Sequence, residues 1–255
     1  GGLSVLEEEK KDIPLSFDDE VVRAIEHKDK VKLRFYMESM CPGCKIFTYM
    51  VLKALMGNDE VRNMVDLEVV PFGNGQLYTD DSFTCQHGPG ECVGNKLIAC
   101  MQHHYPITDQ HKTGFLPAMA CLAQSDDDPE LAAAQCCVKG KISYDVVRQC
   151  AYGHEGDQLA LKAAKDTYAL DPPHQWSPWI TLNHVPVLHS AWDLLPSICE
   201  AYTGPRGGIC RRALHRVKGK GDQSGLSQRR QVDGSGAGYS VCELGSLDDD
   251  VQMPY

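Results

Sequence analysis

Long apolar runs are missing from this sequence. Hydrophobic residues make up 42% of its 255 positions, but polar residues interrupt every apolar stretch within a few positions. A membrane-spanning helix needs about 20 predominantly apolar residues, so we expect no membrane span. Residues 1–20 also lack the basic and apolar regions of a signal peptide, and none of the five asparagines begins an Asn-x-Ser/Thr glycosylation site.

Basic charge is scarce as well. Lys and Arg number 25 against 35 Asp and Glu, which gives a net charge of −10. Such a chain repels phosphate backbones, so we expect no nucleic-acid partner. Nucleotide-binding loops are also missing: there is no P-loop, and in the run from Gly234 to Gly238 no strand precedes the glycines and Tyr239 stands where the third glycine belongs. We therefore expect no cofactor.

Cysteine, by contrast, is plentiful. Twelve cysteines are many for a cytosolic protein and ordinary for a secreted or endomembrane one. The cysteine count therefore favours a secreted or endomembrane protein and a fold stabilised by disulfides.

The first half of the chain has the pattern strand, cysteine pair, helix, strand. Val31 to Met37 alternates apolar and polar residues, and Leu67 to Phe72 is a second β-rich run. Between them, Cys41-Pro-Gly-Cys44 precedes apolar residues at helical spacing from Phe47 to Leu55. The pattern predicts a cysteine pair at the start of a helix that follows a strand.

The rest of the chain suggests three regions. Residues 1–30 are a polar lead-in, and residues 31–212 form the folded domain with a mostly helical, cysteine-rich insertion at about 76–165. Residues 213–255 are poor in large apolar side chains, so we predict a disordered tail. Further expected elements are helices over 130–138, 144–150, 159–170 and 192–202, and a hairpin over 179–188 that turns at Asn183-His184.

Cys41 and Cys44 point to redox chemistry. A helix N-terminus has unpaired N–H groups that stabilise a thiolate, so we expect Cys41 to have a lowered pKa and to be the nucleophile. Cys44, one turn further in, is expected to be more buried. Half of a zinc site or a structural disulfide would also use such a pair, but the sequence has no second Cys-x-x-Cys. Cys85, His87, Cys92 and His103 match no standard zinc spacing, so we expect no metal.

Pro178 stands directly before the apolar run Trp179 to Leu182. A thioredoxin-type site needs a proline, usually cis, beside its cysteine pair at the start of a later strand. An ordinary trans proline would be the default for an isolated X–Pro bond. Together with the upstream strand and cysteine pair, the pattern predicts that Ser177–Pro178 is cis and lies opposite Cys41.

A longer motif carries a specific resemblance. The segment from Cys85 to Cys100, CQHGPGECVGNKLIAC, resembles the signature CQHG-x-x-EC-x-x-N-x-x-x-x-C of the gamma-interferon-inducible lysosomal thiol reductase family, with every constant position present. FYMESMCPGC, VVPFGNGQ, DPPHQWSPWITLNHVPVL and ICEAYTGPRGGIC are similar to other family segments, in family order. The resemblance covers about residues 31–210.

The resemblance implies an α/β thioredoxin-like fold with a helical insertion and an enzyme that reduces protein disulfides at acidic pH. By position, Cys41 is the attacking thiol, Cys44 the resolving thiol and Pro178 the cis-proline. The implied partners are disulfide-containing proteins and a small-molecule thiol or other reductant, and the implied location is the lysosome, the endosome or the outside of the cell. The role of the CQHG segment stays open.

Cysteine parity limits the disulfides. Setting aside Cys41, Cys44 and Cys242 leaves nine cysteines, so one is free or pairs with Cys242. We expect Cys85–Cys92, Cys199–Cys210, and one of the doublet Cys136-Cys137 with Cys150, although spacing alone does not determine connectivity. Two other functions remain open, a disulfide-stabilised extracellular binding module and a zinc protein. Glu38, close to the cysteine pair, is a candidate for proton transfer.

Overall fold

The computed structural model describes residues 30–187, 193–221 and 242–243. Apart from Lys30, the predicted lead-in lies outside these residues, as do parts of the predicted tail. Within the described residues, no helix combines the length and the apolar content that crossing a membrane requires.

A four-stranded sheet forms the centre of the fold, in the order β2-β1-β6-β7. The strands are β1 (Val31–Met37), β2 (Val65–Pro71), β6 (Trp179–Leu182) and β7 (Val185–Pro186). β2 runs parallel to β1, whereas β6 runs antiparallel to β1 and forms a hairpin with β7. The apolar residues that alternate along β1 are fully buried, as the period of two predicted. The sheet thus joins sequence segments about 150 residues apart.

One helical run connects β1 to β2. It comprises α2 (Pro42–Ile46), the π-helical turn η1 (Phe47–Leu52) and α3 (Lys53–Met56), and α4 (Asp59–Met64) follows. Phe47 packs against Phe35 of β1 with ring centroids 4.8 Å apart, which holds the run against the sheet. Asn58 caps α4 by accepting hydrogen bonds from two backbone N–H groups. The predicted strand, cysteine pair, helix and strand are confirmed.

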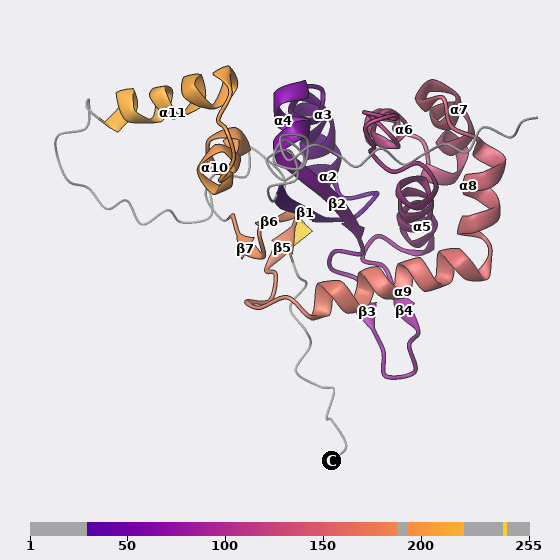
Figure 1. The fold of residues 1–255 in the computed structure, drawn as a ribbon. Coiled ribbons are helices and arrows are strands. Elements are labelled where there is room, and N and C mark those ends of the chain that lie inside the picture. Colours follow the sequence, from indigo (N-terminus) through magenta and orange to yellow (C-terminus); the bar gives the residue numbers. More distant parts are fainter. Residues whose placement is uncertain (1–29, 188–192, 222–241, 244–255) are drawn as a thin grey trace, which may run out of the picture.

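The insertion between β2 and the second half of the sheet is helical, as predicted. It contains the small strands β3 (Gln76–Leu77) and β4 (Phe83–Thr84), then the helices α5 (Pro89–His104), α6 (Leu116–Gln124), α7 (Pro129–Gly140), α8 (Tyr144–Ala151) and α9 (His154–Tyr168). In Figure 1, α5 to α8 gather at one flank of the sheet, and α10 and α11 lie at the other.

Disulfides link the helices of the insertion in a way that differs from one prediction. Cys100 of α5 bonds to Cys150 of α8, and Cys121 of α6 bonds to Cys136 of α7. The expected bond between the Cys136-Cys137 doublet and Cys150 is therefore wrong. Successive residues on a helix point roughly 100° apart, so only one cysteine of the doublet can face α6. Cys137 is buried as a free thiol.

The C-terminal part of the described chain contains α10 (Leu194–Ala201), α11 (Gly208–Gly221) and β8 (Cys242–Glu243). Cys199–Cys210 joins the two helices, and both this bond and Cys85–Cys92 are confirmed predictions. The expectation of disorder from residue 213 onward does not hold for these described residues. α11 crosses that boundary with Ala213 buried, and β8 pairs with β5 (Trp176–Ser177). Residues 222–241 and 244–255 lie outside the described residues.

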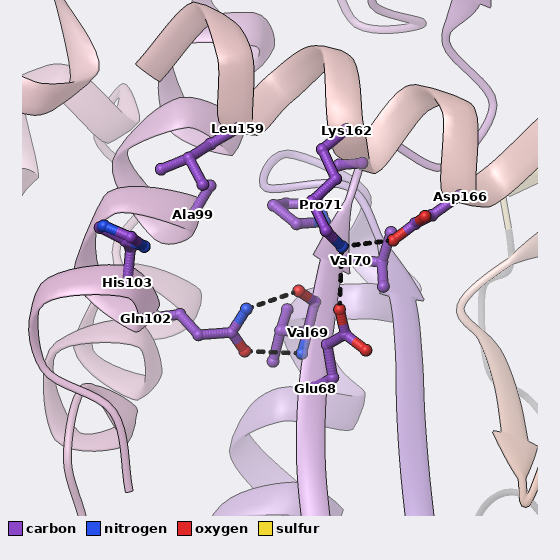
Figure 2. A pocket seen from close by; sticks show the side chains of 11 residues that line it. Glu68, Val69, Val70, Pro71, Ala99, Gln102, His103, Leu159, Lys162 and Asp166 are labelled. Carbon is purple, nitrogen blue, oxygen red and sulfur yellow. Dashed lines mark hydrogen bonds and ion pairs between the residues drawn. The ribbon is translucent and has the colours of Figure 1, made fainter. Parts of the chain in front are cut away.

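A pocket of about 320 Å³ lies between β2, α5 and α9, away from the redox cysteines (Figure 2). The residues that line it hold α5 and α9 against β2. The Gln102 side chain accepts a hydrogen bond from Val69 N at 2.7 Å and donates one to Val69 O at 2.9 Å, so it satisfies the outer backbone groups of the edge strand β2. Lys162 bridges Glu68 and Asp166, which ties α9 to the same strand. No cysteine lines this pocket, so it is not the place of the redox chemistry.

Candidate active site

Cys41 and Cys44 lie where the helical run begins, as predicted. Cys41 is the N-cap of α2 with extended backbone angles, and Pro42 occupies the first turn. Cys44 is a free thiol inside that turn, and the backbone N–H of Glu38 donates to its Sγ at 3.4 Å. Burial raises the pKa of the Cys44 thiol well above its ordinary value. Cys44 is therefore held in the protonated form.

Pro178 stands opposite this cysteine pair. The Ser177–Pro178 peptide bond is cis, which confirms that prediction. Ser177 O lies 3.7 Å from Cys41 Sγ, because the pairing of Tyr36 with Trp179 brings the start of β6 beside the end of β1. The sheet register thus brings the cysteine pair and the proline together from distant parts of the chain.

Cys41 itself is bonded to Cys242. This is a correction, since the sequence indicated Cys41 and Cys44 as the redox pair and placed Cys242 in a predicted tail outside the folded domain. Both Cys41 and Cys44 are fully buried in this state, so the expected difference in exposure is not seen. The physical reason is that β8 pairs antiparallel with β5, with Cys242 opposite Ser177. Backbone pairing of this kind leaves little trace in the sequence of a two-residue strand.

The signature segment forms a polar wall beside the two bonded sulfurs. His87 Nδ1 lies 2.6 Å from Glu91 Oε2 and 3.6 Å from Glu38 Oε2, and His87 Nε2 lies 3.8 Å from Cys242 Sγ. Gly88 has a φ of 88°, a backbone conformation that favours glycine, and it allows α5 to begin directly after His87. Gly88 and the start of α5 therefore place His87 between the buried carboxyl groups of Glu38 and Glu91 and the sulfur of Cys242.

Glu38 is the most perturbed acid of this wall. Burial, together with the nearby charge of Glu91, raises the pKa of the Glu38 carboxyl to about 8, although a hydrogen bond from the Asn74 N–H opposes the shift. Asn74 N donates to Glu38 Oε1 at 2.5 Å, whereas Oε2 has no hydrogen-bond partner among the described residues. Gly73, with a φ of 59°, lies so close that a Cβ there would overlap the Glu38 side chain. Glu38 is thus neutral over the acidic range.

Two asparagines hold the wall in place. Asn95 of α5 accepts a hydrogen bond from Ser39 N at 2.8 Å, and Ser39 Oγ donates to Glu91 O at 3.1 Å. The Asn74 amide nitrogen donates to Cys242 O at 2.8 Å and to Gln86 Oε1 at 2.9 Å. The signature segment therefore shapes the active site and not only the insertion, which answers the question that the sequence left open.

Two sets of residues have side chains of the kinds that bind metal ions. The set Cys85, His87, Cys92 and His103 does not assemble, because Cys85 and Cys92 are bonded to each other. The ligand atoms of Glu38, His87 and Glu91 do lie within 4.8 Å of one another. In this cluster His87 already forms a hydrogen bond with Glu91, and burial raises the pKa of Glu38 to about 8.

Sequence reasoning missed several residues of this site. His87 and Glu91 stand four apart across a helix start, in CQHG-x-x-EC, and that spacing was the signal that could have paired them. Asn74 lies in the turn after the second strand, and only the fold brings it to Cys242. Nothing in the sequence indicated a role for Cys242, apart from the odd number of cysteines that remain when Cys41, Cys44 and Cys242 are set aside.

A thioredoxin-like sheet with Cys-x-x-Cys at a helix start and a cis-proline opposite defines a thiol–disulfide oxidoreductase. The family model "Gamma interferon inducible lysosomal thiol reductase (GILT)" matches residues 32–140. A gamma-interferon-responsive lysosomal thiol protein of Arabidopsis thaliana is 34% identical, over 74% of this chain and 78% of its own length. A gamma-interferon-inducible lysosomal thiol reductase of Carassius auratus is 32% identical, over 73% and 74%. The chain belongs to this thiol reductase family.

Among solved structures, oxidised BdbD from Bacillus subtilis superposes with a TM-score of 0.49 and 15% identity, over 68% of this chain and 88% of that one. A likeness at this level carries no argument about function.

Proposed function

We propose that the protein reduces disulfide bonds of protein substrates at acidic pH, in lysosomes or endosomes or after secretion. The observation that carries this proposal is the free, buried Cys44 thiol one helical turn behind Cys41. The Sγ atom of Cys41 itself lies 3.7 Å from the carbonyl oxygen of Ser177. Relatives from Carassius auratus and Mus musculus bear the name of lysosomal thiol reductases, which supports both the activity and the compartment.

The reaction begins from the reduced pair. The Cys41 thiolate attacks one sulfur of the substrate disulfide, so a Cys41–substrate bond forms and the other substrate sulfur leaves with a proton. The Cys44 thiol then loses its proton and attacks Cys41 Sγ, which releases the second substrate sulfur. Two electrons pass from the dithiol to the substrate, and a Cys41–Cys44 disulfide remains for a small-molecule thiol to reduce.

The surroundings suit this division of roles. Cys41 is the N-cap of α2, and the unpaired N–H groups of a helix start stabilise a thiolate there. Cys44 stays protonated until it is needed, because burial raises its pKa. Since the Glu38 pKa is about 8, this carboxyl is neutral at acidic pH and adds no negative charge that would oppose a thiolate beside it.

Insulin reduction tests the assignment. The assay is best run in a Cys242→Ser background after full reduction of the site, so that only Cys41 and Cys44 are compared. Cys41→Ser should abolish turnover. Cys44→Ser should leave little turnover and accumulate insulin bound to Cys41, visible by non-reducing mass spectrometry.

A buried thiol distant from the site supplies the matched control. Cys137→Ala removes a free cysteine of α7 and should leave turnover unchanged. Equal trapping of insulin on Cys41 and Cys44, or turnover in Cys41→Ser, would contradict the proposed roles. No turnover in the fully reduced Cys242→Ser protein would contradict the function itself.

A further inference from the structure

Cys242 occupies the place that a substrate cysteine must take. Its sulfur is bonded to Cys41, and its backbone pairs with Ser177, the residue that precedes the cis-proline. A protein disulfide under attack by Cys41 has to present one sulfur at this point and a strand along the same edge. β8 therefore has the geometry of a bound substrate segment that belongs to the enzyme's own chain.

We propose that Cys242 is a third redox-active cysteine of this active site, carried by β8 as an internal substrate that blocks Cys41 until the Cys41–Cys242 bond is exchanged. The inference rests on the proposed function, because it assigns Cys41 and Cys44 the same roles toward Cys242 as toward an external protein.

Three separate contacts hold the internal substrate. The first is the antiparallel pairing of Cys242 with Ser177 and of Glu243 with Trp176. The second is the hydrogen bond from the Asn74 side chain to Cys242 O at 2.8 Å. The third is His87, whose Nε2 lies 3.8 Å from Cys242 Sγ. The backbone, the carbonyl oxygen and the sulfur of Cys242 therefore each have their own contact, and its side chain is buried. These contacts hold Cys242 at the site in addition to the disulfide bond.

The exchange balances without an outside reductant. The Cys44 thiol gives its proton to water, and the resulting thiolate attacks Cys41 Sγ. The Cys41–Cys44 bond forms while the Cys41–Cys242 bond breaks, and Cys242 leaves as a thiolate. His87, beside the leaving sulfur, is placed to deliver a proton to it. One disulfide replaces another, and no electron enters or leaves the protein.

Activation for catalysis then needs two electrons. Two molecules of a small-molecule thiol reduce the remaining disulfide and are themselves joined as a disulfide, which leaves Cys41, Cys44 and Cys242 as thiols. Until then the Cys242 thiolate competes with the small-molecule thiol for the Cys41–Cys44 bond, because its attack on Cys41 Sγ restores the Cys41–Cys242 bond and returns Cys44 to a thiol. Because Cys242 is part of the same chain, it does so at an effective concentration on the order of millimolar.

The bond itself is tested first, on the full-length protein. The purified chain is quenched in acid, alkylated and digested without reduction. We expect a peptide pair joined through Cys41 and Cys242 in the wild type, and in Cys44→Ser a bond that persists longer on addition of thiol. Cys242 alkylated as a free thiol in unreduced Cys44→Ser, in which Cys44 cannot displace it, would overturn the proposal.

Activity is tested next, with Cys242→Ser against the matched variant Cys137→Ala. With a small-molecule thiol well below the millimolar range, Cys242→Ser should begin to reduce insulin about tenfold faster than the wild type, and the lag of the wild type should vanish after prior reduction. Cys137→Ala should keep the lag.

The two proposals can fail separately. Equal initial rates and lags in Cys242→Ser and the wild type, with full turnover in both, would overturn the role of Cys242 and leave the reductase function standing. No turnover in any fully reduced variant, together with a mapped Cys41–Cys242 bond, would instead overturn the function.

Discussion

At the scale of single residues, the site depends on a carboxyl group that has been taken out of water. Glu38 is fully buried between Gly73, Asn74 and the His87–Glu91 pair, and its pKa is about 8. Removal from water disfavours the charged form, and a second carboxylate nearby disfavours it further. Because the neutral form is preferred in the fold, Glu38 makes the stability of the protein dependent on pH.

The first prediction concerns Glu38→Gln. In the wild type, the folded state holds a proton on Glu38 between about pH 4.5, the ordinary carboxyl value, and about pH 8, whereas the unfolded state does not. The folded state binds more protons over this range, so Glu38 lowers the stability progressively as pH rises from about 4.5 to about 8.

Glutamine cannot ionise, so the variant should lack this loss and gain stability over the wild type as pH increases. Urea unfolding of both proteins across this pH range measures the difference. A difference in stability that stays constant with pH would contradict the raised pKa.

The second prediction uses two glycines with positive φ. Gly73 and Gly88 have φ values of 59° and 88°, but a Cβ at Gly73 would overlap Glu38, whereas a Cβ at Gly88 would meet no atom within 4 Å. Gly88→Ala should therefore cost only backbone strain, about 1–3 kcal/mol. Gly73→Ala should cost at least about 1 kcal/mol beyond its own backbone strain, because a Cβ there overpacks against Glu38.

The extra cost at Gly73 should disappear when Glu38 is also replaced by Ala. Urea unfolding of the two single variants and of the Gly73→Ala/Glu38→Ala pair completes the double-mutant cycle. An unchanged cost of Gly73→Ala in the Glu38→Ala background would show that Glu38 moves aside without loss.

At the scale of elements, disulfides hold the helical insertion together. Cys100–Cys150 joins α5 to α8 across 50 residues of sequence, whereas Cys85–Cys92 closes a short loop of 7 residues at the start of α5. A cross-link restricts the unfolded chain more when it closes a longer loop. The two bonds should therefore differ in their contribution to stability.

The third prediction compares these two bonds. Replacing both members of Cys100–Cys150 by alanine should lower the free energy of unfolding by roughly 4 kcal/mol, and replacing both members of Cys85–Cys92 by roughly 2.5 kcal/mol. Denaturant titration without reductant measures both losses. The short loop also positions His87, so its loss should slow insulin reduction as well, whereas the loss of Cys100–Cys150 should act mainly on stability. The reverse order of stability losses would contradict the loop-length account.

At the scale of the whole molecule, the C-terminal region contributes in two distinct ways. α11 packs through Ala213 and Leu214 onto the core, and Cys210 Sγ contacts Met64 Sδ at 3.6 Å. β8 instead meets the active site. In this part of the chain, α11 therefore contributes to stability, whereas β8 contributes the cysteine proposed to block Cys41.

The fourth prediction uses two truncations, compared with full-length Cys242→Ser so that the Cys41–Cys242 bond is absent from all three proteins. Removal of residues 222–255 deletes β8, so it should lower the melting temperature only by the loss of the short β5–β8 pairing and should keep turnover at the level of Cys242→Ser. Removal of residues 213–255 also deletes Ala213 and Leu214 from the core. It should lower the melting temperature by several degrees, since about 1 kcal/mol corresponds to roughly 2–4 °C in a domain of this size. Equal melting temperatures for the two truncations would show that the end of α11 does not contribute.

Much of the fold followed from local patterns. The strand at Val31, the helix after Cys41 and the hairpin at Asn183 all appear where period and turn chemistry predicted them. Local signals suffice there because each element buries a face that repeats with its own period. The cysteine pair and Pro178 were recognisable for the same reason, since strand starts and helix starts are marked by residue type.

Long-range partners could not be obtained in this way. The sequence alone determined that a Cys-x-x-Cys pair stands at a helix start in an acidic, cysteine-rich chain of this family. Only the tertiary structure decided that His87 and Glu91 form the wall of the site and that Cys41 bonds to Cys242, 201 residues away. The reason is that loop closure costs little more for a distant cysteine than for a near one, so the strand pairing at Ser177 selects the partner and the spacing does not.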